Sequence, residues 1–517
     1  MVSSTEDSGS TTTSIIFHQE QDIGEAHGRH ELESSRPPRR ALFGKENPTS
    51  SSPLDPHPPL PESYELSTSP PPAAHILSRN VLEAGIGSEG ITSRQAGRPS
   101  GDESPEMEEQ GRPSEKQSSK YRWYARLHFA AICWCFFLQG WNDGTAGPLL
   151  PRVQSVYHIG FAIVSLIFVS TAIGFLAGAA LNVHLDSKFG FGKVMVFGSL
   201  FQTVCYAMMI PEGPFAVRVV AYGVGGFGGA LQLAGGNTFV GNSNKHIERK
   251  LGVMHALYGL GAFAAPLAAT HFSQVYHWTF HFIISLGIAV TNTVVLALVF
   301  KGRTLDECMA EEGHPASEVN SERESGKYRQ ILSMKVVHAL AIFTLVYVGT
   351  EVTLGGWIVT YIIQERSGGA SSGYISSGFF GGITAGRLIL LWLNKKIGER
   401  TALFLYAILC IGLEITVWIV PSLIENAVAI SFVGVLMGPM YPILVNQAKG
   451  VIPRWLLNGS IGWIAAVGQS GSAIIPLVTG VLSAKFGIKS LQPLVVAMMG
   501  VLVGIWMLIP RAHRRAD

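Results

Sequence analysis

Apolar runs long enough to cross a bilayer as helices follow one another from Tyr121 onward, separated by short polar breaks. This pattern predicts an all-α membrane protein with twelve transmembrane helices. No apolar run opens the chain, so we expect no cleavable signal peptide. The helices are predicted near Tyr124–Gly147, Gly160–His184, Lys193–Ile210, Phe215–Gly241, Leu251–Phe272 and Trp278–Phe300, then Val336–Ile363, Ser371–Leu393, Ala402–Val420, Asn426–Val445, Asn458–Ala484 and Leu491–Ile509.

The same pattern divides the chain into five parts. Residues 1–119 are rich in Ser, Pro, Gly and Glu and poor in aromatic residues. Because such a segment cannot bury enough apolar surface to order itself, we expect a disordered cytosolic tail. Residues 120–300 and 331–510 are predicted to form two six-helix bundles. A polar cytosolic loop over residues 301–330 joins them, and residues 511–517 form a short cytosolic tail.

The two predicted bundles repeat one another in sequence, with an offset that drifts slowly in one direction, as small insertions would produce. Two parallel repeats place a substrate site near the bilayer midplane between the halves, where rocking of the halves gives alternating access. The matches are Gly178, Asp186 and Gly190 with Gly386, Asn394 and Gly398 at 208 positions, Asn237 with Asn446 at 209, and Gly261 and Pro266 with Gly471 and Pro476 at 210.

The positions of Lys and Arg predict the orientation, because cytosolic loops carry an excess of both. With both termini and the central loop in the cytosol, the outside loops keep only five basic residues, Arg152, Arg218, Arg366, Lys485 and Lys489. The cytosolic loops and ends then hold Lys120, Arg122, Lys188, Lys193, Lys245, Arg249, Lys250, Lys301, Arg303, Lys395, Lys396, Arg400, Lys449, Arg454, Arg511, Arg514 and Arg515.

Composition agrees with a membrane protein and excludes several other classes. Hydrophobic residues make up 47% of the chain and charged residues 14%, well below the roughly 25% charged residues of soluble domains. No basic stripe with interleaved aromatic residues indicates nucleic-acid binding. No P-loop, HExxH or GxSxG motif is present, so we expect no enzyme, no cofactor and no metal site. The five cysteines are interpreted as free thiols.

Two acidic residues stand inside apolar segments, and they carry the functional hypothesis. Asp143 lies in the first predicted helix and Glu351 in the seventh, each roughly 20 to 25 Å along its helix from the cytosolic side. A carboxylate in a lipid-spanning helix is costly, so it usually faces a cavity and has a function there. Removal from water also favours the protonated form of a carboxyl, which suits a proton-coupling site. Glu414, among apolar neighbours, is interpreted as structural.

The loop Leu185–Lys193 resembles the loop between helices two and three of the major facilitator superfamily, with Ser187 in place of the usual Arg. Three further segments resemble the fucose-proton-symporter-like branch of that superfamily, including its fungal members. They are Trp141–Asp143 followed by Pro148–Pro151, Glu351–Trp357, and Gly459–Ala466.

The resemblance implies a proton-accepting acid in the first helix, where Asp143 stands, and a cytosolic gate, to which we assign Asp186, Lys193 and Arg387. Bacterial members also place a glutamate in the fourth helix, but the stretch Leu231–Asn237 contains no acid. Proton coupling would therefore depend on Asp143 with Glu351, and a uniporter stays open.

A sugar-like ligand needs amides for its hydroxyl groups and an aromatic surface for its C–H face. These requirements select a set of substrate-binding candidates, Gln139, Asn142, Asn237, Tyr258, Trp357, Tyr361, Asn446, Trp463 and Gln469. The sequence thus predicts secondary transport by alternating access, with proton-coupled uptake of a sugar-like or other small polar solute. The expected partners are that solute, protons and the lipid bilayer, without nucleic acid, and the chain is expected to be monomeric. The plasma membrane is favoured over the vacuolar membrane.

Two other functions stay open. A proton-antiporting exporter would be expected to carry the Gly-Pro-x-x-Gly-Gly pattern of drug antiporters in its fifth helix, where this chain has Ala265–Ala269. A non-transporting sensor or scaffold would use the long N-terminal tail for signalling and would show no solute flux.

The orientation can be tested with single cysteines introduced at Ser321 and Ala516. Because both positions are predicted to be cytosolic, an impermeant thiol reagent should label them only after intact cells are permeabilised. Labelling at Ser321 without permeabilisation would reverse the predicted orientation.

Overall fold

The computed structural model describes residues 115–243, 247–313 and 327–511, and this part of the chain is helical without strands. The predicted N-terminal tail up to residue 114, the middle of the predicted central loop and the C-terminal tail from residue 512 lie outside the described residues. The first helix begins at Glu115, a few residues before the predicted start of the first bundle.

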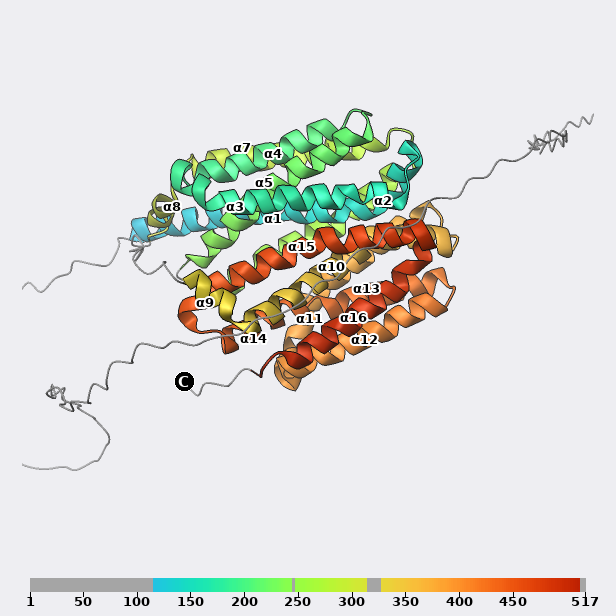
Figure 1. Cartoon of the computed structure of the whole chain (residues 1–517). Helices are drawn as coiled ribbons and strands as arrows, with labels where there is room; N and C mark the ends of the chain where they lie inside the picture. The colour runs from blue at the N-terminus through green and yellow to red at the C-terminus, as the bar shows by residue number, and fades with distance from the viewer. Residues whose placement is uncertain (1–114, 244–246, 314–326, 512–517) are drawn as a thin grey trace, which may run out of the picture. The chain divides into compact units, whose positions relative to one another are not determined.

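The first half of the described chain forms one helical bundle (Figure 1, upper part). Its helices are α1 (Glu115–Tyr157), α2 (Phe161–Val164), α3 (Leu166–Phe189), α4 (Phe191–Met209), α5 (Phe215–Gly241), α6 (Ile247–Ser273) and α7 (His281–Phe300), with a short 3-10 helix η1 (Trp278–Phe280) before α7. Each predicted helix of this half has a counterpart, the second one as the pair α2 and α3.

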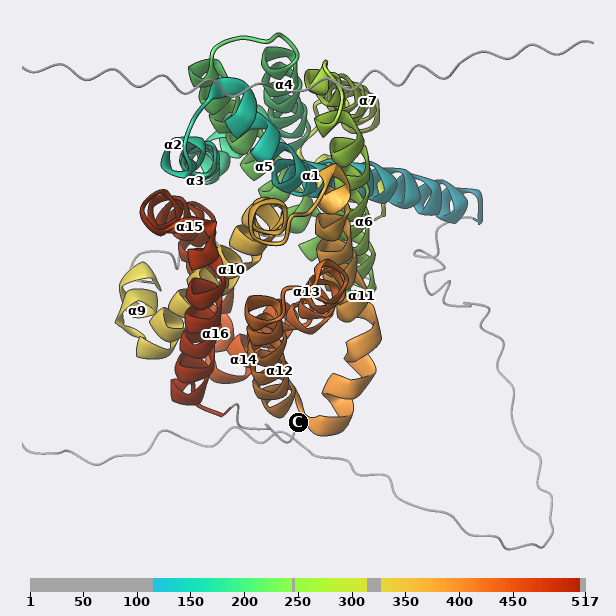
Figure 2. The ribbon, with the colours of Figure 1, turned by 90° about the vertical axis from the view of Figure 1, so that its right-hand side faces the viewer.

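The second bundle lies beside the first in both views of the ribbon (Figures 1 and 2). Two short helices of the predicted central loop, α8 (Leu305–Glu311) and α9 (Lys327–Ser333), precede it. It contains α10 (Lys335–Glu365), η3 (Ala370–Gly373), α11 (Tyr374–Ile397), α12 (Glu399–Ile419), α13 (Leu423–Met437), α14 (Met440–Val451), α15 (Arg454–Phe486), η4 (Ile488–Ser490) and α16 (Leu491–Leu508).

Ten helical segments of the described residues are long and apolar enough to cross a membrane. The two remaining long helices, α1 and α5, are less apolar, since α1 begins with charged turns and α5 is rich in glycine. The prediction of an all-α membrane protein with two helical bundles is confirmed.

Close contacts between helices repeat in the two halves. A Cβ added at Gly178 in α3 would lie 2.6 Å from the backbone oxygen of Phe227 in α5, and at Gly386 in α11 it would lie 1.9 Å from that of Val435 in α13. Both members of the second pair are shifted by 208 positions from the first. Small residues allow helix backbones to approach this closely in membranes. The sequence repeat is therefore a repeat of packing.

The helix ends repeat as well. Gly190 follows α3 with a φ of 84°, and Gly398 follows α11 with a φ of 85°. A residue with a side chain adopts this backbone conformation only with strain, so glycine suits the sharp turn after each helix. The two turns link equivalent helix pairs, α3 with α4 and α11 with α12.

The halves touch one another through small and aromatic residues. We call the end of the bundle that carries α8 and α9 the linker end (Figure 1, left). Towards the opposite end, a Cβ at Gly147 in α1 would lie 2.2 Å from the backbone oxygen of Gly355 in α10. The ring of Trp357 packs there against Phe161 and Phe168, with centroid distances of 5.9 and 6.2 Å. At this opposite end of the bundle, which we call the far end, the two halves are thus in close contact.

Packing through glycine predicts unequal effects of the same substitution. A Cβ at Gly261 in α6 would lie 2.1 Å from the backbone oxygen of Phe137 in α1, whereas none of the nearby atoms is within 4 Å of a Cβ at Gly287 in α7. Gly261→Ala should lower the thermal stability of the detergent-purified protein, because overpacking costs about 1–3 kcal/mol. Gly287→Ala is the matched control, and alanine is favoured there by up to about 1 kcal/mol. Equal melting temperatures for the two variants would contradict this account.

Candidate functional site

Ionisable side chains from both halves meet between α1, α6, α10 and α11. The hydroxyl of Tyr258 in α6 donates a hydrogen bond to the carboxylate of Asp143 in α1. Tyr258 also interacts electrostatically with Glu351 in α10 and with Arg387 in α11. Tyr347, one turn before Glu351 on α10, interacts with both Glu351 and Arg387. Tyr258 therefore connects the acid of the first half to the charged pair of the second.

Asp143 faces the space between the halves. At about 100° per residue, Asp143 lies on the same face of α1 as Gly140 and Gly147. Gly140 packs against Tyr258 of α6, and Gly147 packs against Gly355 of α10. Asp143 is nevertheless solvent-exposed. Toward the opposite end, Gly147 and Gly355 bring α1 and α10 into close contact.

The charges of this cluster nearly cancel. Asp143 and Glu351 contribute two carboxylates that interact with each other, and Arg387 contributes one guanidinium. With both acids ionised the cluster carries one net negative charge, which a single proton neutralises. Charges inside a membrane protein are tolerated when they pair with one another or line a water-filled space. In this cluster Arg387 interacts electrostatically with Glu351, and Asp143 is solvent-exposed.

A network of amides lies beside Asp143 within the first half. The side-chain oxygen of Gln232 in α5 accepts hydrogen bonds from Gln139 in α1 at 3.3 Å and from Gln202 in α4 at 3.0 Å. Asn142 joins the network by donating to Gln202 at 3.4 Å and accepting from Tyr206. Gln232 is fully buried. The network holds α1 in register with α4 and α5, next to the carboxylate.

The sequence alone pointed to Gln139 and Asn142 but missed the residues that bind them. Gln232 stands in the stretch of the fourth predicted helix that contains no acid, and Gln202 lies in a helix to which no function was assigned. Their polar side chains inside apolar helices were the available signal. Neither the helix pattern nor the spacing shows which of these amides face one another.

Two of the predicted aromatic platforms have packing partners inside the bundle. The indole of Trp357 is buried and donates to the backbone oxygen of Pro476 in α15 at 3.3 Å. Tyr361 is buried, and its hydroxyl accepts from Arg366 at 2.7 Å. Trp357 thus belongs to the contact between the halves, whereas Tyr361 contacts Arg366, which follows α10 in the second half.

The other predicted substrate contacts are spread along the second half and α5. Trp463 is 38% exposed and lies edge-on to His338 of α10. Gln469 donates to Ser472 in its own helix at 3.3 Å, and Asn237 to the backbone oxygen of Leu233 at 2.9 Å. Asn446 donates to Glu399 of α12 at 2.9 Å, away from the charged cluster.

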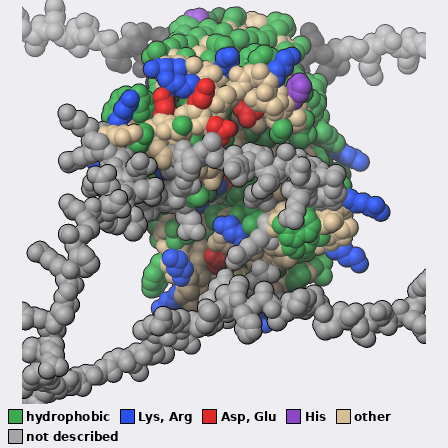
Figure 3. Space-filling model, turned by 90° about the vertical axis from the view of Figure 1, so that its left-hand side faces the viewer, with side chains coloured by type: hydrophobic (Ala, Val, Ile, Leu, Met, Phe, Trp, Pro, Cys, Tyr) green, Lys and Arg blue, Asp and Glu red, His purple; other side chains and the backbone are tan. Residues whose placement is uncertain are grey.

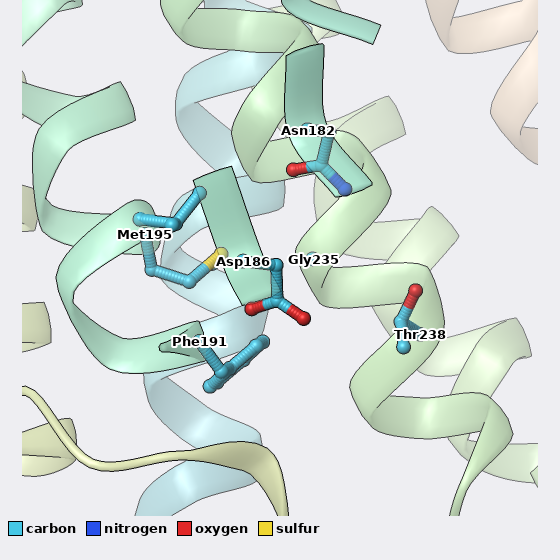
Figure 4. Close-up of a pocket in the computed structure, with 7 residues that line it drawn as sticks. Asn182, Asp186, Phe191, Met195, Gly235 and Thr238 are labelled. Carbon is cyan, nitrogen blue, oxygen red and sulfur yellow. The ribbon is translucent and has the colours of Figure 1, made fainter. Parts of the chain in front are cut away.

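The three residues assigned to the cytosolic gate fall into two places. Asp186 at the end of α3 lines a small pocket with residues of α4 and α5, among them Phe191, Met195 and Thr238 (Figure 4). Lys193 stands at the start of α4, with its side chain against Gly302. Arg387 lies instead in the charged cluster with Glu351.

Within the described chain, no group of three His, Cys, Asp or Glu side chains is placed to hold a metal ion.

The family model of the Major Facilitator Superfamily matches residues 132–454, more than half of the chain. The chain belongs to the Major Facilitator Superfamily. The family and the fold are those of membrane transporters, and the chain is an integral multi-pass membrane protein. This membership agrees with the resemblance of the loop Leu185–Lys193.

This Major Facilitator Superfamily chain is similar to curated proteins along most of its length. Bypass of stop codon protein 6 of Saccharomyces cerevisiae is 27% identical over 414 residues, which cover 75% of this chain and 83% of that protein. The glucose/mannose transporter GlcP of Bacillus subtilis is 21% identical, covering 73% and 93%. A glucose/galactose transporter of Brucella abortus is 24% identical, covering 68% and 87%.

Solved structures of transporters share the fold. The D-xylose-proton symporter aligns with a TM-score of 0.61 at 10% identity, over 75% of this chain and 99% of that one. The nucleoside transporter NupG aligns with the same TM-score and identity, over 74% and 99%. At this identity the likeness concerns the fold alone.

The charged cluster predicts that Arg387 and Glu351 are coupled in stability. Arg387→Gln removes the one guanidinium and leaves two neighbouring carboxylates without a counter-charge, so the melting temperature in detergent should fall. The double variant with Glu351→Gln should recover part of that loss, because interacting residues show coupling energies of about 0.5–3 kcal/mol. Additive losses in the two single variants and the double variant would contradict an interaction between these side chains.

Proposed function

We propose that this chain is a secondary transporter that takes up a sugar-like or other small polar solute together with protons, by alternating access of its two halves. The observation that carries the proposal is the solvent-exposed Asp143 between the halves, hydrogen-bonded by Tyr258 and linked through it to Glu351 and Arg387. An acid that is both accessible to water and joined to groups of the other half is suited to couple protonation to movement of the halves.

The coupling follows from the charges of the cluster. A proton on Asp143 or Glu351 neutralises the surplus negative charge, removes the repulsion between the two carboxylates and weakens the interaction of that acid with Tyr258. Because Asp143 belongs to the first half and Glu351 to the second, the repulsion between the two carboxylates across the interface depends on protonation. The neutral cluster can then enter a closed, water-free arrangement at lower cost than the charged one.

The amides beside Asp143 support a polyhydroxylated solute. Gln139 and Asn142 lie on α1 beside the acid, each partly exposed, and amides can both donate to and accept from hydroxyl groups. Two of the similar proteins are named as sugar transporters, the glucose/mannose transporter GlcP of Bacillus subtilis and the glucose/galactose transporter of Brucella abortus. The segments around Asp143, Glu351 and Gly459 further favour the fucose-proton-symporter-like branch and a fungal-type member.

The same proposal includes the orientation of the chain in the membrane, the side on which it is closed, and its oligomeric state. With both termini in the cytosol, as the Lys and Arg positions favour, the linker end is cytosolic and Asp143 is reached from inside the cell. The packed contacts of Gly147 and Trp357 then form the closed extracellular side. We further propose a monomer in the plasma membrane, with the solute and protons as partners.

The role of Asp143 can be tested in liposomes with a panel of labelled hexoses and deoxyhexoses. Asp143→Asn keeps the shape and a hydrogen-bonding group but cannot bind the proton. Accumulation driven by an inward proton gradient should therefore disappear, whereas counterflow exchange of the solute, which needs no net proton movement, should persist. Wild-type accumulation by Asp143→Asn with unchanged pH dependence would overturn the proton-site assignment.

Glu351→Gln is the matched comparison, since it removes the other carboxyl of the cluster. It should weaken transport more mildly, through binding or through the balance of inward and outward states, because Asp143 still carries the proton. Loss of both accumulation and exchange in Asp143→Asn would mark that residue as a binding or structural group. Equilibration that ignores the gradient in the unmodified protein would indicate a uniporter.

A further inference from the structure

A groove runs between α1 and α7 on the outer surface of the first half, and it has a volume of about 440 Å³. Volumes of this size are typical of sites that hold a small molecule or part of a larger one. The residues that line the groove are Leu127, Ala130, Ala131 and Trp134 of α1 and Thr291, Val295 and Val299 of α7. The groove is therefore large enough to hold an occupant.

The shape of the groove follows from the position of small residues on α1. Ala130 and Ala131 lie between the larger Leu127 and Trp134 on one helical face, because residues three, four and seven positions apart share a side of a helix. The wall residues of α7 are four positions apart and form a similar row. The only hydroxyl among the lining residues, that of Thr291, donates to a backbone oxygen of its own helix at 2.8 Å. The surface of the groove is thus almost entirely apolar.

The groove faces the bilayer. Ala130 and Thr291 are exposed, and α7 belongs to a segment that is long and apolar enough to cross a membrane. Because the hydrocarbon of the bilayer replaces water as the solvent at this depth, exposed apolar surface there meets acyl chains. An occupant of the groove must therefore be apolar along most of its length.

Cations stand where the groove ends. Leu127 and Val299 are the lining residues nearest to the linker end, and α7 itself ends one residue later, before the exposed Lys301. Because the two walls run in opposite directions, the residues that precede Leu127 in α1 stand at the level of those that follow Val299. The nearest of them is the exposed Arg126. One cation from each wall thus flanks the groove at the linker end.

Beyond the groove, α1 continues as a basic and aromatic helix. Its 43 residues rise roughly 65 Å, whereas the apolar layer of a bilayer is about 30 Å thick. Figure 2 shows α1 running out past the other helices. Its first turns carry the exposed Lys120, Arg122 and Trp123, and no acid follows until Asp143. Tryptophan is enriched at the membrane surface, and clustered Lys and Arg bind anionic lipids there.

The two flanking cations are available to an outside anion. Within the described chain, neither Arg126 nor Lys301 forms an ion pair, whereas the nearby Arg303 is paired with Glu311. Figure 3 shows the linker end face-on, with basic side chains around its margin and acidic ones nearer the middle of the first half. The margin, which meets the lipid headgroups, is therefore positively charged and complementary to phosphate.

We propose that this groove binds an anionic phospholipid, with an acyl chain between α1 and α7 and the headgroup phosphate held by Arg126 and Lys301. A phospholipid carries the two chemistries of this surface in the same order, an apolar chain within the bilayer and a negative group at its edge. Trp123 precedes Leu127 by one turn on the same face of α1, so its ring lies where chain and headgroup meet. The site is separate from the transport proposal and does not depend on proton coupling at Asp143.

Native mass spectrometry of the purified full-length protein in a non-ionic detergent tests the site. The affinity of the first bound lipid is compared for dioleoyl phosphatidylglycerol and dioleoyl phosphatidylcholine, which have the same acyl chains but differ in net charge. Phosphatidylglycerol should bind about tenfold more tightly, because each cation near an anionic headgroup strengthens binding roughly fivefold. Equal affinities for the two lipids would overturn the proposal.

The cations are tested by Arg126→Gln combined with Lys301→Gln, which should abolish the preference for phosphatidylglycerol. Lys395→Gln combined with Lys396→Gln is the matched control, because it removes the same charge from exposed residues at the end of α11. This control should keep the preference. A preference that survives the first pair of substitutions, or that both pairs abolish, would show that the groove does not select the headgroup.

The groove itself is tested by Ala130→Trp, which fills it from the exposed face of α1 and should weaken binding of both lipids at least about fivefold. Ala297→Trp is the control, since Ala297 is exposed on α7 but does not line the groove. If Ala130→Trp does not yield folded protein by size-exclusion chromatography, Thr291→Phe fills the groove from the other wall with the same expected result. Unchanged affinity in the groove variant would refute the acyl-chain site. Displacement of the lipid by glycerol 1-phosphate, which lacks acyl chains, would assign the cations to a soluble anion and refute it as well.

Discussion

The position of the candidate site depends on the close approach of α1 and α6 through glycine. Gly140, Gly144 and Gly261 allow backbone atoms of one helix to lie where a Cβ of the other would be. This packing leaves little freedom to rotate α1 about its axis, so Asp143 is held on the face that looks into the interface. Tyr258, whose backbone lies against Gly140, is brought to the carboxylate by the same contact. Helix packing, rather than a loop, positions the acid.

The same type of packing recurs in the second half, where Gly471 of α15 lies against the backbone oxygen of Leu345 in α10. There it holds α10 so that Tyr347 and Glu351 face Arg387. Each half is therefore built on one helix pair, α1 with α6 or α10 with α15, and each pair presents an acid to the interface. The two halves differ in chemistry, since the amide network belongs to the first and the guanidinium to the second.

Charge is distributed unevenly along the bundle, and this has mechanical consequences. Toward the far end, the halves meet through Gly355, Trp357 and other uncharged side chains, which can separate without leaving unpaired charges. At the linker end, by contrast, His128 of α1 forms a hydrogen bond with Glu312, which follows α8, and Arg303 forms an ion pair with Glu311. Charged contacts thus stiffen the linker end of the first half, whereas the packed contacts between the halves toward the far end are uncharged. Such a division suits two bundles that move as units.

The sequence by itself determined the helical membrane fold, the two repeated halves and the presence of an acid in the middle of α1 and of α10. Each of these is a local property, because hydrophobic length and the cost of a charge in lipid act along one helix at a time. The tertiary structure decided which polar groups meet. Arg387, which the sequence assigns to the cytosolic gate, interacts with Glu351, and Trp357, a candidate ligand contact, packs against Phe168 of the other half. The partners Gln232 and His128 were not foreseen, because contacts between helices depend on rotation and register that no single helix encodes.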